Sequence, residues 1–203
     1  MKRAPFVAAL LISLSPLAFA ASKPAEPSGS EPKKDEGQLS SATLSGLTLR
    51  SIGPALTSGR ISDLAVDPTD SKVWWIGVAS GGVWKSTNAG TTWSPVFDGE
   101  GSYSIGALTI DPKNPSVVWV GTGEGNVRNS ASYGNGVYKS VDGGESWSHL
   151  GLAGSERIHR IVLHPKDENV AWVAAMGPLW SEGKERGVYK TVDGGKSWRN
   201  VLF

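Results

Sequence analysis

A pattern of 12 residues that occurs three times constrains this chain more than any other feature. The copies begin at Gly82, Gly136 and Gly187, so they are 54 and 51 residues apart. Each copy has Val, an aromatic residue, Lys, then Ser or Thr, a turn and a Trp. A repeat of this length, built from β-forming residues and Gly turns, is typical of β-propeller blades. The sequence therefore predicts an all-β fold of three four-stranded antiparallel blades, which form an incomplete ring.

The turn in each copy has the form Ser/Thr-x-Asp-x-Gly-x-x-Trp. The Asp carboxylate can accept backbone N–H groups of its own turn, Gly supplies a positive φ, and the Trp ring can cover the hairpin. The first copy has Asn and Ala in place of Asp and Gly, and Asn can still accept as a neutral group. We expect these residues to be structural rather than catalytic. They are Ser86, Asn88, Gly90 and Trp93; Ser140, Asp142, Gly144 and Trp147; and Thr191, Asp193, Gly195 and Trp198.

Short β-forming runs between Pro and Gly turns divide each repeat into four strands. The blades are expected at about 58–98, 102–151 and 155–203. The predicted strands are 61–66, 73–78, 83–86 and 92–97; 105–110, 117–121, 137–140 and 146–150; and 158–163, 170–175, 188–191 and 197–202. One further strand is expected at 47–52, where it could close a ring as the outer strand of the last blade.

The N-terminal 43 residues are not expected to belong to the fold. Lys2 and Arg3 precede an apolar run, and Ala18-Phe19-Ala20 fits the small-residue rule for cleavage, so 1–20 is predicted to be a signal peptide. The alternative is an uncleaved membrane anchor, for which the run is short. Residues 21–43 are rich in Ser, Pro, Glu and Lys, which predicts a disordered linker before a partial propeller at 44–203. The chain is expected to be exported, to the periplasm or the outside of a bacterium, with no integral membrane span after cleavage.

Charge and composition exclude several classes of partner. Without Lys2 and Arg3 the chain has 18 basic and 19 acidic residues, which gives a net charge of −1. This charge gives no reason to expect a nucleic acid partner. The chain has no Cys, which excludes disulfides and thiolate chemistry. Its three His residues are scattered, and no spacing is typical of metal ligands. The Gly-rich run 121–125 lacks the spacing and the following helix of a nucleotide loop, so no cofactor is expected.

Because neighbouring strands run antiparallel, successive loops of a blade lie on alternate faces; we call this rule strand parity. The turns after the first and third strands of each blade share one face, which carries the Asp and Pro turns. The loops after the second strands and the connections between blades share the other face. The loop 121–136 is long for a compact blade, and loops of this length more often have a function than not. The alternative is an ordinary solvated loop, because surface loops are generally polar. The candidate ligand-binding residues on this face are Arg60, Tyr103, Glu124, Arg128, Tyr133, Trp180 and Arg186.

The repeated turns resemble the Asp boxes of sialidases and sortilin-type (Vps10) propellers. The region from Ser51 to Phe203 is similar to the N-terminal part of large bacterial secreted proteins with such propellers, often called glycosyl-hydrolase-like. The stretches that carry the resemblance are 52–54, 58–61, 79–85, 103–106, 119–124 and 186–191. It implies that this chain is part of a longer protein, whose further blades lie on the same chain or come from a partner. It implies no settled activity.

Three functions are compatible with these features. The first is a binding module for peptide or carbohydrate, whose aromatic and charged loop residues would hold the ligand. The second is a glycoside hydrolase, sialidase-like or xyloglucanase-like, with Glu124, Glu156 and Glu182 as weak candidates for the catalytic carboxyl groups and arginines nearby. The Phe/Tyr-Arg-Ile-Pro motif of sialidases is absent, and no complete catalytic constellation occurs. The third is a purely structural module whose Trp-rich blades hold a larger protein together.

Overall fold

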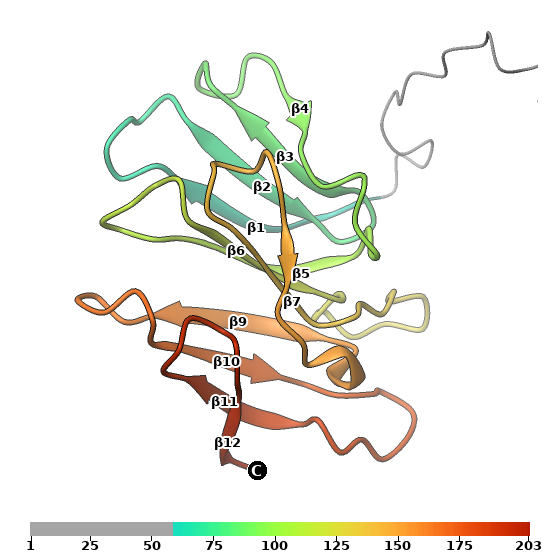
Figure 1. The fold of residues 1–203 in the computed structure, drawn as a ribbon. Helices are drawn as coiled ribbons and strands as arrows, with labels where there is room; N and C mark the ends of the chain where they lie inside the picture. Colours follow the sequence, from blue (N-terminus) through green and yellow to red (C-terminus); the bar gives the residue numbers. More distant parts are fainter. Residues whose placement is uncertain (1–58) are drawn as a thin grey trace, which may run out of the picture. The chain divides into compact units, whose positions relative to one another are not determined.

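The computed structural model describes residues 59–203, which form three four-stranded antiparallel sheets (Figure 1). This confirms the predicted all-β blades. The predicted signal peptide, the predicted linker and the strand predicted at 47–52 lie outside the described residues. Blade 1 consists of β1 (Ile61–Val66), β2 (Trp74–Val78), β3 (Gly82–Ser86) and β4 (Ser94–Pro95). Blade 2 consists of β5 (Ile105–Ile110), β6 (Val118–Thr122), β7 (Val137–Ser140) and β8 (Ser148–His149). A 3-10 turn, η1 (Ala153–Ser155), leads to blade 3, which consists of β9 (Ile158–Leu163), β10 (Ala171–Ala175), β11 (Gly187–Thr191) and β12 (Arg199–Leu202).

The strands follow one another in chain order within each sheet, and each pairs with its neighbour in an antiparallel register. The fourth strands are shorter than predicted, and each starts two residues later than predicted because the Asp turn extends to its Trp. The pairing of the first and second strands skips one residue at the same position in every blade: Ser62, Gly106 and His159. Such a bulge bends the strand next to the loops that follow the second strands.

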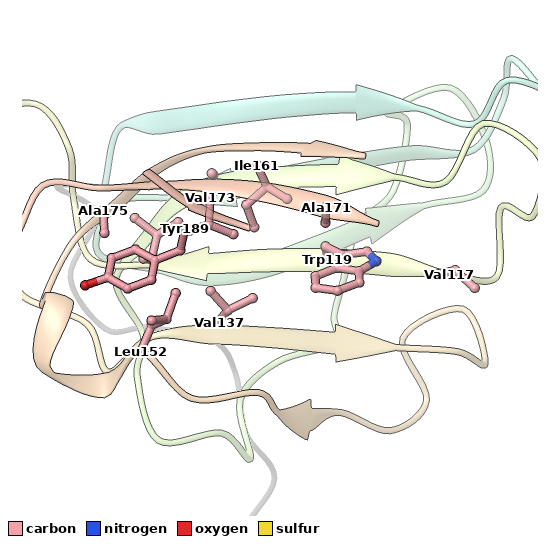
Figure 2. Close-up of a cluster of buried hydrophobic side chains, with 11 residues drawn as sticks. Val117, Trp119, Val137, Leu152, Ile161, Ala171, Val173, Ala175 and Tyr189 are labelled. Carbon is pink, nitrogen blue, oxygen red and sulfur yellow. The ribbon is translucent and has the colours of Figure 1, made fainter. Parts of the chain in front are cut away.

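Hydrophobic side chains fill the two spaces between neighbouring sheets. Between blades 1 and 2 the buried residues are Trp75, Val83, Phe97, Ile105, Leu108, Ile110, Val118, Val120 and Tyr138. Between blades 2 and 3 they include Trp119, Val137, Leu152, Ile161, Val173 and Tyr189 (Figure 2). Trp75 and Trp119 are fully buried, whereas Trp74, Trp84 and Trp172, which also lie in strands, are only half-buried. Each core therefore lies between blades, and no blade buries its apolar residues alone.

The Asp turns and the Pro turns lie on the same face, as strand parity predicts. In each blade the backbone N–H after the Asx residue donates to a carbonyl of the first turn: Ala89 to Lys72, Gly143 to Ser116 and Gly194 to Asn169, at 2.8 to 2.9 Å. In the described part of the chain, no helix has the length and apolar character needed to cross a membrane.

Candidate functional site

Each Asp turn is closed by its own hydroxyl groups. In blade 2 the Ser140 hydroxyl donates to the Asp142 carboxylate (2.7 Å) and accepts from the Gly144 N–H (2.8 Å). The other end of the turn binds the same carboxylate, because the Ser146 hydroxyl and N–H donate to its two oxygens at 2.5 and 3.0 Å. These bonds, those of Ser146 above all, hold the pKa of Asp142 well below its ordinary range.

The turns of blades 1 and 3 repeat this arrangement. In blade 3, hydrogen bonds from Ser197 and Thr191 lower the pKa of Asp193 to about 2. In blade 1 the Asn88 side-chain oxygen accepts from the Ser86 hydroxyl (3.0 Å) and from the Thr92 N–H (2.8 Å). The neutral amide therefore takes the same place as the carboxylates. Carboxylates engaged by their own turns have little capacity left for a ligand.

The opposite face brings the loops after the second strands against the connections between blades. The Gly82 N–H donates to the Tyr103 carbonyl (2.8 Å), and the Gly134 N–H donates to the Glu156 carbonyl (2.6 Å). At Gly123, φ is +89°, and a Cβ would lie 1.9 Å from the Glu156 carbonyl oxygen. Only glycine fits there, so the 123–136 loop is fixed against the connection that leads to blade 3.

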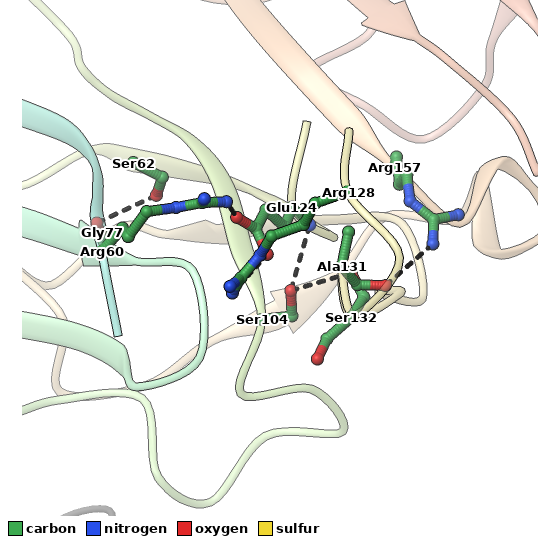
Figure 3. Close-up of polar contacts among 9 residues, drawn as sticks. All are labelled: Arg60, Ser62, Gly77, Ser104, Glu124, Arg128, Ala131, Ser132 and Arg157. Atoms are coloured by element: carbon green, nitrogen blue, oxygen red, sulfur yellow. Dashed lines mark hydrogen bonds and ion pairs between the residues drawn. The ribbon is translucent and has the colours of Figure 1, made fainter. Parts of the chain in front are cut away.

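Glu124 is the centre of a charged cluster on this face (Figure 3). Its side chain is 0% exposed and forms ion pairs with Arg60, from the start of blade 1, and with Arg128, from its own loop. The Arg128 Nη2 to Glu124 Oε2 distance is 3.5 Å, and both arginine side chains stay partly exposed. Ser104 fixes the glutamate backbone, because its hydroxyl accepts from the Glu124 N–H (3.0 Å) and donates to the Ser132 carbonyl (3.1 Å). Three predicted ligand-face residues thus meet at one place, which we call the Glu124 cluster.

A second arginine site lies beside the same loop. Arg157, which begins blade 3 as Arg60 begins blade 1, is buried; its guanidinium donates to Glu156 (2.9 Å) and to the Ala131 carbonyl (3.2 Å). The Nε atoms of Arg157 and Arg128 are buried without a hydrogen-bond partner in the described structure. Arg157 and Ser104 lie in blade connections that strand parity assigns to this face, but they were not among the candidate ligand-binding residues. The signal that could have found them is their place directly before the first Ile of a blade, which Arg60 also has.

The remaining predicted ligand-face residues form no ion pair or hydrogen bond with Glu124 in the described part of the chain. Tyr103 and Tyr133 are exposed and belong to the segments that enclose the cluster. Trp180 is 76% exposed in the loop between β10 and β11. Arg186 in that loop donates to the Pro178 carbonyl (2.7 Å), and Glu182 is exposed. None of the contacts within residues 59–203 joins Trp180, Glu182 or Arg186 to Glu124. The same region holds no group of three or more His, Cys, Asp or Glu that could bind a metal ion.

Solved structures with a similar fold include GH74 enzymes. The GH74 enzyme of Niastella koreensis is 30% identical with a TM-score of 0.50, over 68% of this chain and 21% of that chain. An ancestral GH74 enzyme is 23% identical with a TM-score of 0.56, over 76% of this chain and 20% of that one. The GH74 xyloglucanase of Xanthomonas campestris is 21% identical with a TM-score of 0.51, over 68% and 22%. The chain thus spans about one fifth of the length of these structures.

No curated protein matches the chain. The family model described as sortilin, neurotensin receptor 3, matches residues 81–202, which is more than half of the chain. This region contains the three Asp turns, the Glu124 loop and most residues of the two inter-blade cores. The chain belongs to the Sortilin-Vps10 family.

Proposed function

We propose that the loop face around the Glu124 cluster is a binding surface for a peptide or a carbohydrate, and that the arginines of the cluster bind an anionic group of the ligand. The observation that carries the proposal is the fully buried Glu124 between Arg60 and Arg128. A guanidinium has five N–H donors, so each arginine keeps donors beyond those that Glu124 engages. Two arginines and one carboxylate leave one positive charge for an anionic ligand.

The surroundings of the cluster suit a ligand of moderate size. Tyr103 and Tyr133 project to solvent from segments that contact the cluster, and exposed aromatic rings are common contact residues for sugars and peptides. Glycines at 123 and 134 let two backbones approach closely and fix the loop before any ligand binds. A fixed binding surface loses less entropy when a ligand binds.

Binding can be tested with paired probes that differ in one charge. The peptide pair is a short peptide with a free C-terminal carboxylate and its C-terminal amide; the sugar pair is a neutral oligosaccharide and one that contains a uronic acid. Titration of the chain should show stronger binding of the acidic member of at least one pair. Arg128→Ala should weaken that binding at least tenfold, which about 1.4 kcal/mol would produce.

Arg186→Ala is the matched control, because Arg186 is an exposed arginine of the same predicted face without a contact to Glu124. It should change binding less than twofold. Equal effects of the two substitutions, or no preference for either acidic probe, would refute the proposed anion site.

A second candidate function is glycoside hydrolysis, which the 30% identity with a GH74 enzyme favours. Hydrolysis needs two carboxyl groups on either side of the scissile bond. Glu124 is fully buried and paired with two arginines, so it is not open to a substrate oxygen in this arrangement. Glu156 is 38% exposed but is paired with Arg157. Release of a chromogenic leaving group from an aryl glycoside, lost in Glu124→Gln, would establish hydrolysis in place of binding.

We also propose that the chain is exported after cleavage before Ala21. Mass spectrometry of the protein recovered from the cell envelope and the medium would test this. A mature N-terminus at Ala21 supports export with cleavage; an intact N-terminus in the membrane fraction would support the anchor instead.

A further inference from the structure

The turn between the first and second strands of each blade is closed by one side chain at the end of the first strand. In blade 1 the Asp67 carboxylate accepts the backbone N–H groups of the residues two and three positions ahead, at 2.7 and 3.2 Å. In blade 2 the Asp111 carboxylate accepts the same two N–H groups of its own turn, at 2.8 and 3.2 Å. A carboxylate at this position thus binds the turn that follows it, as aspartates commonly do.

Blade 3 has a histidine at this position. The His164 Nδ1 atom accepts the backbone N–H groups of Lys166 (3.2 Å) and Asp167 (3.0 Å), which are again two and three positions ahead. The backbone of the three turns is also closed in the same way, in blade 3 by the His164 N–H, which donates to the Val170 carbonyl (2.9 Å). An imidazole nitrogen therefore takes the place of a carboxylate oxygen in an equivalent turn.

This hydrogen-bond pattern requires a neutral ring. A ring nitrogen that accepts N–H groups carries no proton, so the proton of His164 is on Nε2 in the closed turn. An imidazolium has a proton on both nitrogens, and its Nδ1–H would point at two other donors. Histidine is the side chain that gains its charge between about pH 8 and 5, whereas aspartate stays ionised over that range. Mild acid can thus remove the acceptor in blade 3 but not those in blades 1 and 2.

Charged groups of both neighbouring turns face the His164 ring. The ring lines a polar pocket of about 340 Å³ between the first turns of blades 2 and 3. The charged residues of this pocket are Asp111 and Lys113 of blade 2, and Lys166, Asp167 and Glu168 of blade 3.

Two further lysines lie around this pocket. The Lys139 ammonium of β7 interacts with Asp111 and Glu168. On the β10 side the ring centre of His164 lies 6.1 Å from that of Trp172, which the Lys190 ammonium of β11 covers. The carboxylates attract a charged ring and the lysines repel it, so these effects oppose one another. The loss of the Nδ1 acceptor acts in one direction only, against the closed turn.

The turn that His164 closes makes contacts in two directions. The Lys166 carbonyl accepts from the Lys113 ammonium of blade 2 (3.2 Å). The Asn169 carbonyl accepts from the Gly194 N–H in the Asp turn of blade 3 (2.9 Å). Opening of the turn would release both carbonyls. A change at His164 therefore affects the boundary with blade 2 and the neighbouring Asp turn.

We propose that His164 is an acid-sensitive switch: the neutral ring closes the first turn of blade 3, and protonation of Nδ1 opens this turn and weakens its contact with blade 2. The closed turn holds no proton at Nδ1 and the open turn can hold one, so a fall in pH favours opening. The argument rests on the hydrogen bonds of three equivalent turns and does not depend on the proposed ligand site, which lies on the opposite face.

The first test is NMR of the natural chain. At about pH 7 the ring nitrogens of His164 should show the proton on Nε2, and a second proton should appear on Nδ1 as the pH falls to about 5. Hydrogen exchange, corrected for its intrinsic dependence on pH, should report the turn. The protection of the Lys166 and Asp167 N–H groups should fall about tenfold between these pH values, the ratio that about 1.4 kcal/mol produces. The Gly194 N–H should lose protection with them.

Exchanges between histidine and aspartate make the test specific. His164→Asp gives blade 3 the acceptor of the other blades, so the protection of its turn should stay constant between about pH 7 and 5. Asp67→His gives blade 1 the acceptor of blade 3, so the corresponding N–H groups of blade 1 should become acid-sensitive. His159→Gln changes an exposed histidine outside the turn and should leave the acid sensitivity of blade 3 unchanged.

Several outcomes would overturn the proposal. These are a proton on Nδ1 already at neutral pH, equal protection of the blade 3 turn at both pH values, and an undiminished loss of protection in His164→Asp. A loss of protection of equal size in all three blades would also overturn it, because it would show general unfolding in acid. The ring nitrogens and the protection are measured on the natural chain, so they decide the question even if a variant does not fold.

Discussion

Arg60 and Glu124 form an ion pair across the boundary between blades 1 and 2, although 63 residues separate them in the chain. Arg128 binds the other oxygen of the same carboxylate. The pair joins the start of one blade to the long loop of the next, so it affects both the stability of the junction and the proposed ligand surface.

Glu124→Gln should lower the free energy of unfolding by about 1–3 kcal/mol, because it removes charged hydrogen bonds from a fully buried group. Urea denaturation at neutral pH measures this difference. Glu182→Gln is the control: this glutamate is exposed, and the change should stay within about 0.5 kcal/mol. Equal stabilities of the two variants would show that the Glu124 ion pairs do not hold the junction.

Gly144→Ala should destabilise the chain more than Gly143→Ala. Both glycines have positive φ, so alanine costs about 1–2 kcal/mol at either position. At Gly144 the new Cβ would also lie 2.7 Å from the Trp75 ring, whereas at Gly143 its nearest contact is the end of the Lys85 side chain at 3.4 Å. Overpacking adds about 1–3 kcal/mol at Gly144. Thermal or urea unfolding of the two variants compares them, and an equal loss would contradict the close contact.

Trp147→Phe should cost about 0.5–1.5 kcal/mol beyond the effect of Trp93→Phe. The Trp147 indole donates to Val96 of the preceding blade, and its loss leaves a carbonyl unpaired at the junction. Trp93 occupies the equivalent position in blade 1 and has no such bond among the described residues. Urea midpoints of both variants provide the comparison, and a larger loss for Trp93→Phe would be inconsistent with a role for the indole bond.

Stability should fall as the pH falls from about 4 to 2, partly because of Asp142 and Asp193. Their pKa values in the folded chain are lowered by bonds from their turns, that of Asp193 to about 2, so the unfolded chain binds protons first. The stabilisation is thus complete above the unfolded pKa of about 3.9 and is lost as the pH falls through the folded values.

The double substitution Asp142→Asn and Asp193→Asn should make the unfolding free energy less dependent on pH between 4 and 2. Asn88 shows that the amide can form the same turn. Urea denaturation at several pH values tests this, and an unchanged slope in the double variant would assign the acid sensitivity to other groups.

The sequence by itself determined the blades and the two loop faces. The turns depend on residues close together in the chain: Ser140 and Ser146 both donate to Asp142 within seven residues, so the pattern predicts the turns directly. Strand parity then assigns each loop to a face, whatever the details of packing. The turn at Asn88 could also be predicted from the sequence, because the Asn side-chain oxygen accepts the same hydrogen bonds as the Asp carboxylates.

Only the tertiary structure decided which loop residues meet and which flanks are covered. Glu124 was predicted as a ligand-face residue, and its full burial accompanies contacts with Arg60 of a different blade and with the Ser104 hydroxyl. Trp74 and Trp172 both lie in predicted strands, yet the Trp74 ring lies against Gly90 of its own blade's turn and the Trp172 ring lies beneath the Lys190 ammonium. The reason is physical: burial and ion pairing depend on contacts between blades, and a repeat pattern does not specify how far two such residues lie apart in space.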